Sequence, residues 1–345
     1  MPEISVLMSV YNGEKYLKAA LDSILNQTFS DFEFIVVDDG STDQTSGILD
    51  GCSDSRMVRL HNPYNIGLTR SLNRGLETVK SRYIARMDAD DIAVPERLQE
   101  QIDFMEQHPE IGMLSGNIRL INPTGEVLNN DEPVYEKAAS HEMLKWQLLW
   151  TNPVPHMTVM LRKDVLDKHH LTYVPEYNTA EDHELWATLA QHTRLVRLNR
   201  VWAFHRRIES SVSHSRREDQ LATQYRVIAR EIQKLLDDSI PESDIQTLFE
   251  ILYREKNIHH NYSGAARIIT AAYHLQKPAS AEDQREMEGD AASYLHKTAR
   301  RAGLHAPRQM LYSLWELRKI SRREFASRTT LRTLRQIIQK SVLPG

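Results

Sequence analysis

The sequence contains a single cysteine and no long hydrophobic run. With only Cys52 available, an internal disulfide and a cysteine-rich zinc site are both excluded, and a lone thiol suits a reducing compartment. No window approaches the ~20 consecutive apolar residues of a membrane-spanning helix. No basic segment precedes the apolar stretch near the N-terminus, so no signal peptide is expected. These absences predict a cytoplasmic protein.

The composition is that of an ordinary globular protein in which charge is unevenly distributed. Of 345 residues, 41% are apolar and 26% are charged, and the formal net charge is −4, which excludes a chain that is disordered throughout. The length suggests about two domains. Residues 297–345 contain 12 Lys and Arg against 2 Asp and Glu, whereas residues 1–296 carry a net charge of −14. This asymmetry indicates an acidic body and a basic tail that binds an anionic partner.

Short β-rich runs alternate with helical periods over residues 1–90. The predicted strands are Ile4–Val10, Phe32–Val37, Met57–Leu60 and Tyr83–Met87. This alternation predicts an α/β fold with a mostly parallel sheet that helices cover on both faces. In open α/β sheets ligands bind at the carboxyl ends of the strands. Two acidic clusters, Asp38-Asp39 and Asp88-Ala89-Asp90, fall at such ends.

The remaining chain continues the pattern and then becomes helical. Helices are predicted at Glu96–Gln107, His141–Leu149 and Glu181–Gln191, strands at Thr158–Leu161, Leu195–Leu198 and Val201–Phe204, and a hairpin between Met113–Ile121 and Val127–Leu128. From about Glu218 onward, apolar residues recur at helical spacing. We therefore expect a helical C-terminal region after the α/β part.

The acidic clusters permit two interpretations each. Asp88 and Asp90 lie on the same side of an extended segment, where their oxygens could bind Mg²⁺ or Mn²⁺ and the metal could grip a diphosphate. A solvated acidic turn is the alternative. Asp38 and Asp39 are either ordinary turn residues or acceptors of hydrogen bonds from a nucleobase and a ribose. The two clusters together are more informative than either alone.

Five segments occur in a characteristic order: ISVLMSVYN, QTFSDFEFIVVDDGSTD, NIGLTRSLNRGL, YIARMDADD and AEDHELW. As a set they resemble family 2 inverting glycosyltransferases with the GT-A fold, over about residues 3–213. The resemblance implies a GT-A-type, Rossmann-like catalytic domain over residues 1–217. Its nucleotide-sugar half would cover about 1–120 and its acceptor half about 121–217. Residues 218–345 would then form the helical region with its basic tail.

The same resemblance implies roles for the donor-side residues. The Asp38/Asp39 pair is similar to the contact for the base and ribose, Asp88 to a contact for the ribose or diphosphate, and Asp90 to the metal ligand. Tyr11 and Asn12 would lie beside the bound nucleotide, although Tyr11 could simply pack against its own turn. A UDP-sugar is the favoured donor, and Mg²⁺ or Mn²⁺ the expected cofactor.

Glu181 and Asp182 precede an amphipathic stretch, so Asp182 could simply cap a helix. In the family, however, an aspartate of this pair is the catalytic base, which removes the proton of the acceptor hydroxyl as it attacks the anomeric carbon. The resemblance therefore implies that Asp182 is the base and that Glu181 binds the acceptor or orients the loop. The reaction would be a single in-line displacement with inversion and without a covalent intermediate.

Further basic residues are candidates for the donor or acceptor side. Arg86 precedes Asp88 and could pair with a carboxylate or the diphosphate, and Arg70 could face the donor cleft or be a surface residue. His156 occurs in an N-P-x-x-H segment similar to one near the acceptor in the family, and a surface loop histidine is the alternative. The candidates for phosphate contact in FHRRIESSVSH are His205, Arg206 and Arg207, with a basic loop as the alternative.

The expected function is transfer of a sugar from a nucleotide diphosphate donor to a saccharide or lipid-linked saccharide, as the resemblance implies for bacterial surface polysaccharide biosynthesis. Residues 308–343 combine apolar and basic residues, so the tail either binds an anionic membrane surface or packs on the protein as a helical cap. No motif indicates nucleic acid.

Alternative functions lack their motifs. A sugar-phosphate nucleotidyltransferase would need a glycine-rich phosphate loop, and a nicotinamide dehydrogenase would need a G-x-G-x-x-G motif; neither is present. A carbohydrate-binding relative without turnover is the non-enzymatic alternative, against which the intact Asp90 and Asp182 count.

Overall fold

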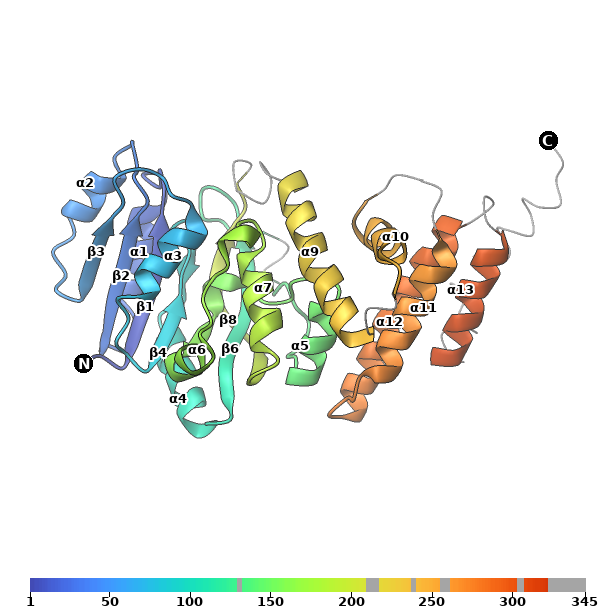
Figure 1. Cartoon of the computed structure of the whole chain (residues 1–345). Helices are drawn as coiled ribbons and strands as arrows, with labels where there is room; N and C mark the ends of the chain where they lie inside the picture. The colour runs from blue at the N-terminus through green and yellow to red at the C-terminus, as the bar shows by residue number, and fades with distance from the viewer. Residues whose placement is uncertain (129–131, 209–216, 237–239, 255–260, 303–306, 322–345) are drawn as a thin grey trace. The chain divides into compact units, whose positions relative to one another are not determined.

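The structure, a computed structural model, describes residues 1–128, 132–208, 217–236, 240–254, 261–302 and 307–321. The chain divides into two compact units, Met1–Gln224 and Tyr225–Gly345. Figure 1 colours them from the blue N-terminus to the red C-terminus. Each unit is described by itself.

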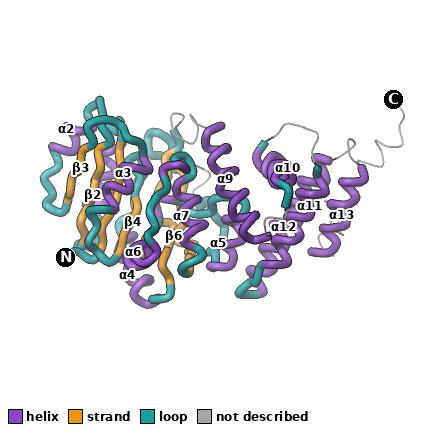
Figure 2. The backbone as a smooth tube through the Cα atoms, in the orientation of Figure 1, coloured by secondary structure: helices purple, strands orange, loops and turns teal. Residues whose placement is uncertain are grey.

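The first unit is built on one eight-stranded sheet, with strand order β3-β2-β1-β4-β7-β6-β8-β5. Its strands are β1 (Ile4–Val10), β2 (Phe32–Asp38), β3 (Met57–His61), β4 (Tyr83–Arg86), β5 (Ile92–Ala93), β6 (Ile111–Ile121), β7 (Met160–Arg162) and β8 (Arg194–Arg206). Strands β1 to β4 pair in parallel, as do β6 and β8, whereas β7 and β5 run antiparallel to their neighbours. Figure 2 shows these strands as a single layer.

Helices cover both faces of the central part of this sheet. All seven residues of β1 are buried, and since side chains alternate between faces, both faces of that strand must be covered. The helices of the unit are α1 (Leu17–Leu25), α2 (Thr45–Asp50), α3 (Leu68–Leu76), α4 (Arg97–Gln107), α5 (His141–Leu148), α6 (Lys163–His169) and α7 (Glu181–Leu189). On α3, Gly75 permits close packing on β1, because a Cβ there would collide with Leu7.

Several predicted elements differ in detail from the observed ones. The two strands predicted at Leu195–Leu198 and Val201–Phe204 form one strand, β8, whose pairing with β6 shifts register near Asn117. The Asn117 amide donates to Asn199 at 2.8 Å, so the polar residues that suggested a turn bridge the two strands instead. The predicted hairpin is reduced to one bridge between Ile121 and Val127, because β6 pairs with β7 and β8. The strand predicted at Thr158–Leu161 starts later, at Met160, after a 3-10 turn over His156–Thr158.

The second unit is helical. It comprises most of α9 (Arg217–Leu236), followed by α10 (Glu242–Tyr253), α11 (Tyr262–Leu275), α12 (Ala281–Ala302) and α13 (Pro307–Ile320). Its core contains Leu248, Ile269, Leu295, Leu314 and Leu317. No helix in the described parts of the chain is long and apolar enough to cross a bilayer. The predicted basic tail begins in α13, and its residues from 322 onward lie outside the described residues.

Candidate active site

The two carboxylates at the end of β2 are buried and hold neighbouring loops. Asp39 accepts hydrogen bonds from the Asn62 side chain at 2.8 Å and from the backbone N–H groups of Ile66 and Gly67, each at 2.9 Å. Asp38 accepts one from the Ser41 N–H at 3.0 Å. Both residues are 2% exposed. The predicted nucleotide contacts therefore also organise the backbone that leads into α3.

Two loops beside these carboxylates are joined by side chains. Asn12, in the left-handed region with φ +52°, accepts a hydrogen bond from the Thr42 N–H at 2.8 Å. The Asn12 N–H donates to the Ser41 hydroxyl at 3.0 Å, and the Gly13 N–H donates to the Thr45 hydroxyl at 2.8 Å. Tyr11 is 47% exposed beside them. The loop after β1 and the loop after β2 are thus connected at the edge where the sheet ends.

Three aspartates lie in the turn between β4 and β5. Asp88 accepts a 2.6 Å hydrogen bond from the buried Arg86 guanidinium, whose charge holds the pKa of Asp88 below its usual value despite burial. Asp91 accepts a bond from the Arg206 N–H at 2.8 Å, and each of its oxygens lies 3.2 Å from His205 Nδ1. Asp90 has no ion-pair partner among the described residues.

The charges in this turn shift each other's ionisation. Burial, followed by the charges of Asp91 and Asp88, raises the pKa of Asp90 to about 7. Burial lowers the pKa of His205, but the hydrogen bond to Asp91 and the three aspartate charges outweigh it and raise that pKa to about 9. The turn therefore combines a positively charged imidazole with a carboxylate that lacks a counter-ion.

A divalent cation fits this donor set. In the described part of the chain, no group of three or more His, Cys, Asp or Glu side chains could hold a metal ion by itself. A Mg²⁺ site, however, often uses one or two carboxylates together with the phosphates of a substrate. Asp90, a partly buried carboxylate without a counter-ion, suits such a site because a cation would compensate its charge.

Glu181 and Asp182 form the first turn of α7. Asp182 does not cap the helix, because it is the second residue of α7 and the N-cap residue is Ala180. Its carboxylate accepts hydrogen bonds from the Asn152 side chain and from the His183 N–H, each at 2.7 Å. Burial raises the pKa of Asp182 to about 6, although these two hydrogen bonds act to lower it. Burial and the charge of Asp182 raise the pKa of Glu181 to about 8.

Asp88 connects the two acidic groups electrostatically. Its charge raises the pKa of Asp90 on one side and those of Glu181 and Asp182 on the other. The Arg86 guanidinium likewise acts on Glu181 and Asp182. The acidic turn after β4 and the start of α7, some ninety residues apart in the sequence, therefore influence each other's ionisation.

The chain is similar in sequence to members of one family. The sequence model described as Glycosyl transferase family 2 matches residues 5–169. Over 185 residues, the chain is 34% identical to the O-antigen biosynthesis glycosyltransferase WbnJ of Escherichia coli, covering 53% of this chain and 70% of that protein. The chain belongs to glycosyltransferase family 2.

Further relatives are named as glycosyltransferases, and a solved structure shares the fold. The UDP-Glc:alpha-D-GlcNAc-diphosphoundecaprenol beta-1,3-glucosyltransferase WfgD of Escherichia coli is 29% identical, over 62% of this chain and 80% of that protein. An uncharacterized glycosyltransferase of Haemophilus influenzae is 32% identical over 55% of this chain, which spans only 61% of that relative's length. The crystal structure of S. aureus TarS 1–349 in complex with UDP-GlcNAc has a TM-score of 0.56 and 19% identity, and the match covers 92% of this chain and 90% of that chain. This likeness confirms the predicted fold.

The remaining predicted site residues of this family 2 chain lie in different environments. Arg70, on α3, is exposed and pairs with no described residue, and Arg207 is also exposed. Arg206 is buried, and its guanidinium donates to the carbonyls of Asp90, Asn122 and Pro123. Its Nε and Nη1 donors are therefore engaged within the protein, and phosphate pairing by these arginines stays a prediction.

His156 and Asn152 come from the same N-P-x-x-H segment. His156 is buried, and its Nε2 lies 2.8 Å from the Tyr173 hydroxyl. Burial, followed by the Arg86 charge, lowers the pKa of His156 well below its usual value, so the ring is neutral. Sequence reasoning selected His156 but missed Asn152, the hydrogen-bond donor to Asp182. Its position four residues before His156 was the available signal.

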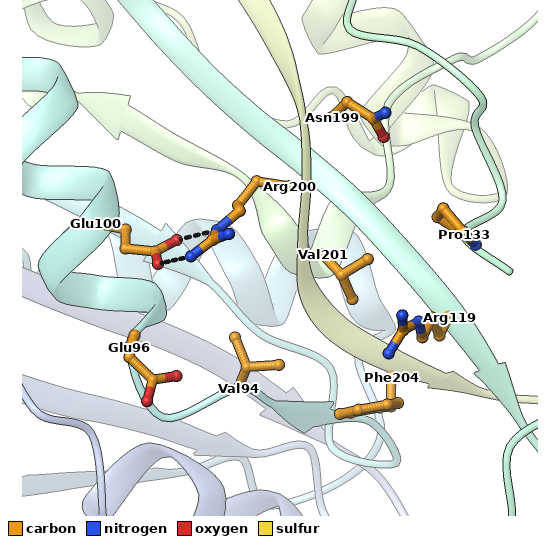
Figure 3. Close-up of a pocket in the computed structure, with 9 residues that line it drawn as sticks. All are labelled: Val94, Glu96, Glu100, Arg119, Pro133, Asn199, Arg200, Val201 and Phe204. Carbon is orange, nitrogen blue, oxygen red and sulfur yellow. Dashed lines mark hydrogen bonds and ion pairs between the residues drawn. The ribbon is translucent and has the colours of Figure 1, made fainter. Parts of the chain in front are cut away.

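A surface pocket of about 410 Å³ lies elsewhere in this family 2 unit, between α4, β6 and β8 (Figure 3). None of the predicted site residues lines it. Its main charged groups are already paired, since the Arg200 guanidinium donates to both oxygens of Glu100, at 2.5 and 2.9 Å. Phe204 forms part of its wall and precedes His205 on β8, where successive side chains point to opposite faces of the sheet.

Proposed function

We propose that this chain transfers a sugar from a nucleoside diphosphate sugar to a saccharide or lipid-linked saccharide, with inversion, in bacterial surface polysaccharide biosynthesis. The observation that carries the proposal is the single electrostatic group formed by Asp90, Asp88 and the Glu181/Asp182 pair. The names of WbnJ and WfgD support the polysaccharide context, and that of WfgD a lipid diphosphate acceptor. The UDP-GlcNAc complex of TarS supports a UDP-sugar donor.

Asp182 acts as the general base in this mechanism. It takes the proton from the acceptor hydroxyl while that oxygen attacks the anomeric carbon, and the nucleoside diphosphate leaves from the opposite face. Asn152 fixes one carboxylate oxygen and the His183 N–H fixes the other. A pKa of about 6 leaves Asp182 ionised at neutral pH and more basic than an ordinary aspartate. Glu181, with a pKa of about 8, keeps its proton and donates a hydrogen bond to the acceptor.

The donor side binds and orients the nucleotide. Asp38 and Asp39 contact the base and ribose, Tyr11 and Asn12 lie beside them, and Asp88 contacts the ribose or diphosphate. Asp90 holds Mg²⁺ or Mn²⁺, which when bound neutralises charge on the departing diphosphate. His205 lies against Asp91 in the same turn and has a raised pKa, and its positive charge adds to that stabilisation.

A screen of nucleotide sugars tests the proposed function. Base and sugar are varied independently, and Mn²⁺-dependent hydrolysis and thermal stabilisation are measured for each donor. We expect one or a few UDP-sugars to be hydrolysed slowly and to raise the melting temperature, because a bound ligand stabilises the folded state. A complete absence of both effects across UDP-, GDP- and dTDP-sugars, with and without Mn²⁺, would contradict the proposal.

We further propose that the basic C-terminal tail brings this cytoplasmic enzyme to an anionic membrane surface, where lipid-linked acceptors reside. In support, α13 exposes Leu311 and Trp315, which are 56% and 51% exposed, and Lys319 lies over the Trp315 ring at 3.6 Å. Residues 322–345 add six Lys and Arg against one Glu. Aromatic and basic residues together favour the interface of anionic lipids.

Deletion of residues 322–345 is therefore expected to weaken binding to anionic vesicles. The deletion stops short of α13, because Leu314 and Leu317 belong to the core of the second unit. Each basic residue near an anionic surface contributes about 1 kcal/mol, so removing six should reduce sedimentation with phosphatidylglycerol vesicles strongly. Neutral phosphatidylcholine vesicles are the control. Equal sedimentation of the full chain and the deletion variant would contradict membrane binding by the tail and favour the alternative, a helical cap that packs on the protein.

A further inference from the structure

Arg97, near the start of α4, is a fully buried cation without an acidic partner. Its side chain is 0% exposed, and no carboxylate of the described residues lies within ion-pair distance of it. Burial and the neighbouring Arg86 charge lower its pKa to about 9. A buried charge without a counter-ion is costly to the folded state, so its position calls for a reason beyond packing.

The guanidinium of Arg97 joins two segments of the candidate site. Nη2 donates to the carbonyl of Arg86 at 2.7 Å and lies 3.4 Å from that of Val159, and the Arg86 N–H donates to the same Val159 carbonyl at 2.9 Å. Nε donates to Gln101 Oε1 at 3.0 Å, and the Gln101 amide donates to the Thr158 carbonyl at 2.7 Å. One segment leads directly into Asp88 and Asp90, and the other follows directly after His156.

We propose that Arg97 is a positioning residue, which holds the acidic turn after β4 in register with the His156–Val159 segment. The inference rests on the proposed function for its catalytic meaning. Arg86 and Arg97 are buried, and the positive charges of both act on Asp88. A planar guanidinium suits this task, because it directs several donors at fixed angles to carbonyls of different segments.

Arg162 provides a matched comparison in the same unit. It too donates to backbone carbonyls, those of Ile111 at 2.8 Å and His108 at 3.2 Å together with Met105, and it has no ion-pair partner in the described chain. Its pairing partner in the sheet is Tyr83, at the start of β4, whereas Arg86 is at the end of that strand. Arg162 therefore serves a similar structural purpose away from the acidic turn.

The test compares R97M, R97K and R162M in the full chain. Hydrogen exchange measured by mass spectrometry reports the two segments without reference to activity. We expect R97M to speed exchange in peptides covering 86–93 and 154–160. R162M should instead act around 105–111 and at Tyr83, to whose hydroxyl Arg162 donates at 2.9 Å, and should leave those two peptides unchanged. In transfer assays R97M should lower kcat on the order of 10²-fold, with little change in KM, because small displacements of reacting groups have effects of this size.

R97K keeps the charge but lacks the planar fork, so it should recover part of kcat. A residue that merely filled space would give equal results for R97K and R97M. If R97M does not fold, R97K compared with R162M makes the same distinction. Unchanged exchange in either segment, or a fall in kcat that R162M matches, would overturn the proposal. If the wild-type chain transferred no sugar from any donor, the proposed function would fail, and the exchange experiment alone would still decide whether Arg97 holds the two segments.

Discussion

Asp182→Asn is expected to lower kcat for sugar transfer by roughly 10²–10⁴-fold, the usual contribution of a positioned general base. Asparagine has nearly the same shape and can still accept the His183 N–H bond through its carbonyl oxygen, but it cannot take the proton of the acceptor hydroxyl. Donor binding should persist, because the residues assigned to the nucleotide lie at the ends of β1, β2 and β4 and on α3, and not on α7. Transfer kinetics and calorimetric titration with the donor nucleotide, measured on one preparation, separate the two effects.

The pH dependence of the wild-type enzyme is a second test of Asp182 as the general base. Because the base must be ionised, kcat should rise as the pH passes upward through about 6, the pKa of Asp182. Any residual activity of Asp182→Asn should not show this rise of kcat with pH. Asp164→Asn, which changes an exposed carboxylate on α6, is the matched control and should behave as wild type. If Asp182→Asn turned over nearly as fast as Asp164→Asn, Asp182 would not be the general base.

Asp90→Asn is expected to weaken Mn²⁺-dependent binding of the donor nucleotide, on the order of 10²-fold. The amide oxygen is a poorer ligand than a carboxylate, and the substitution removes the acidic charge that lacks a counter-ion in the turn. Since Asp90 makes no ion pair with a described residue, the fold should tolerate the change, and the melting temperature should stay near that of wild type.

The measurement is calorimetric titration with UDP in the presence of Mn²⁺ and again with EDTA. Wild type should lose affinity when the metal is removed, whereas Asp90→Asn should show nearly the same weak affinity in both conditions. Asp103→Asn on α4, an exposed carboxylate that accepts a bond from Gln99, is the matched control. Metal-dependent binding by Asp90→Asn equal to that of the control would contradict the assignment of Asp90 as the metal ligand.

The strands of the first half could be predicted almost residue by residue, whereas those of the second half could not. Strand β1 runs over Ile4–Val10 as predicted, and β2 extends one residue further than its prediction, to Asp38. These central parallel strands are short, mainly apolar runs bounded by polar turn residues, which local pattern identifies. Strand β8 instead contains Asn199 and Arg200, which resemble a break. Its continuity depends on the cross-strand amide of Asn117, a contact between residues 82 positions apart.

The same distinction applies to the site. Carboxylates such as Asp88 and Asp182 could be selected from sequence because their spacing and the family resemblance mark them. Asn152 and Arg97 could not, since each acts through a partner that only the folded chain places beside it. An asparagine before a proline or an arginine in a helix has ordinary explanations within its own segment. Buried polar groups that support a site are therefore found from contacts more readily than from motifs.

Hydrogen bonds between the loop after β1 and the loop after β2 limit how the proposed donor site could be re-engineered. Asn12 and Gly13 are tied to Thr42, Ser41 and Thr45 by hydrogen bonds between side chains and backbone. A graft that imported only one loop from a homologue would replace one partner in each of these bonds. Altering donor choice by segment exchange would therefore require residues 11–14 and 41–45 to be transplanted together, as a single cassette.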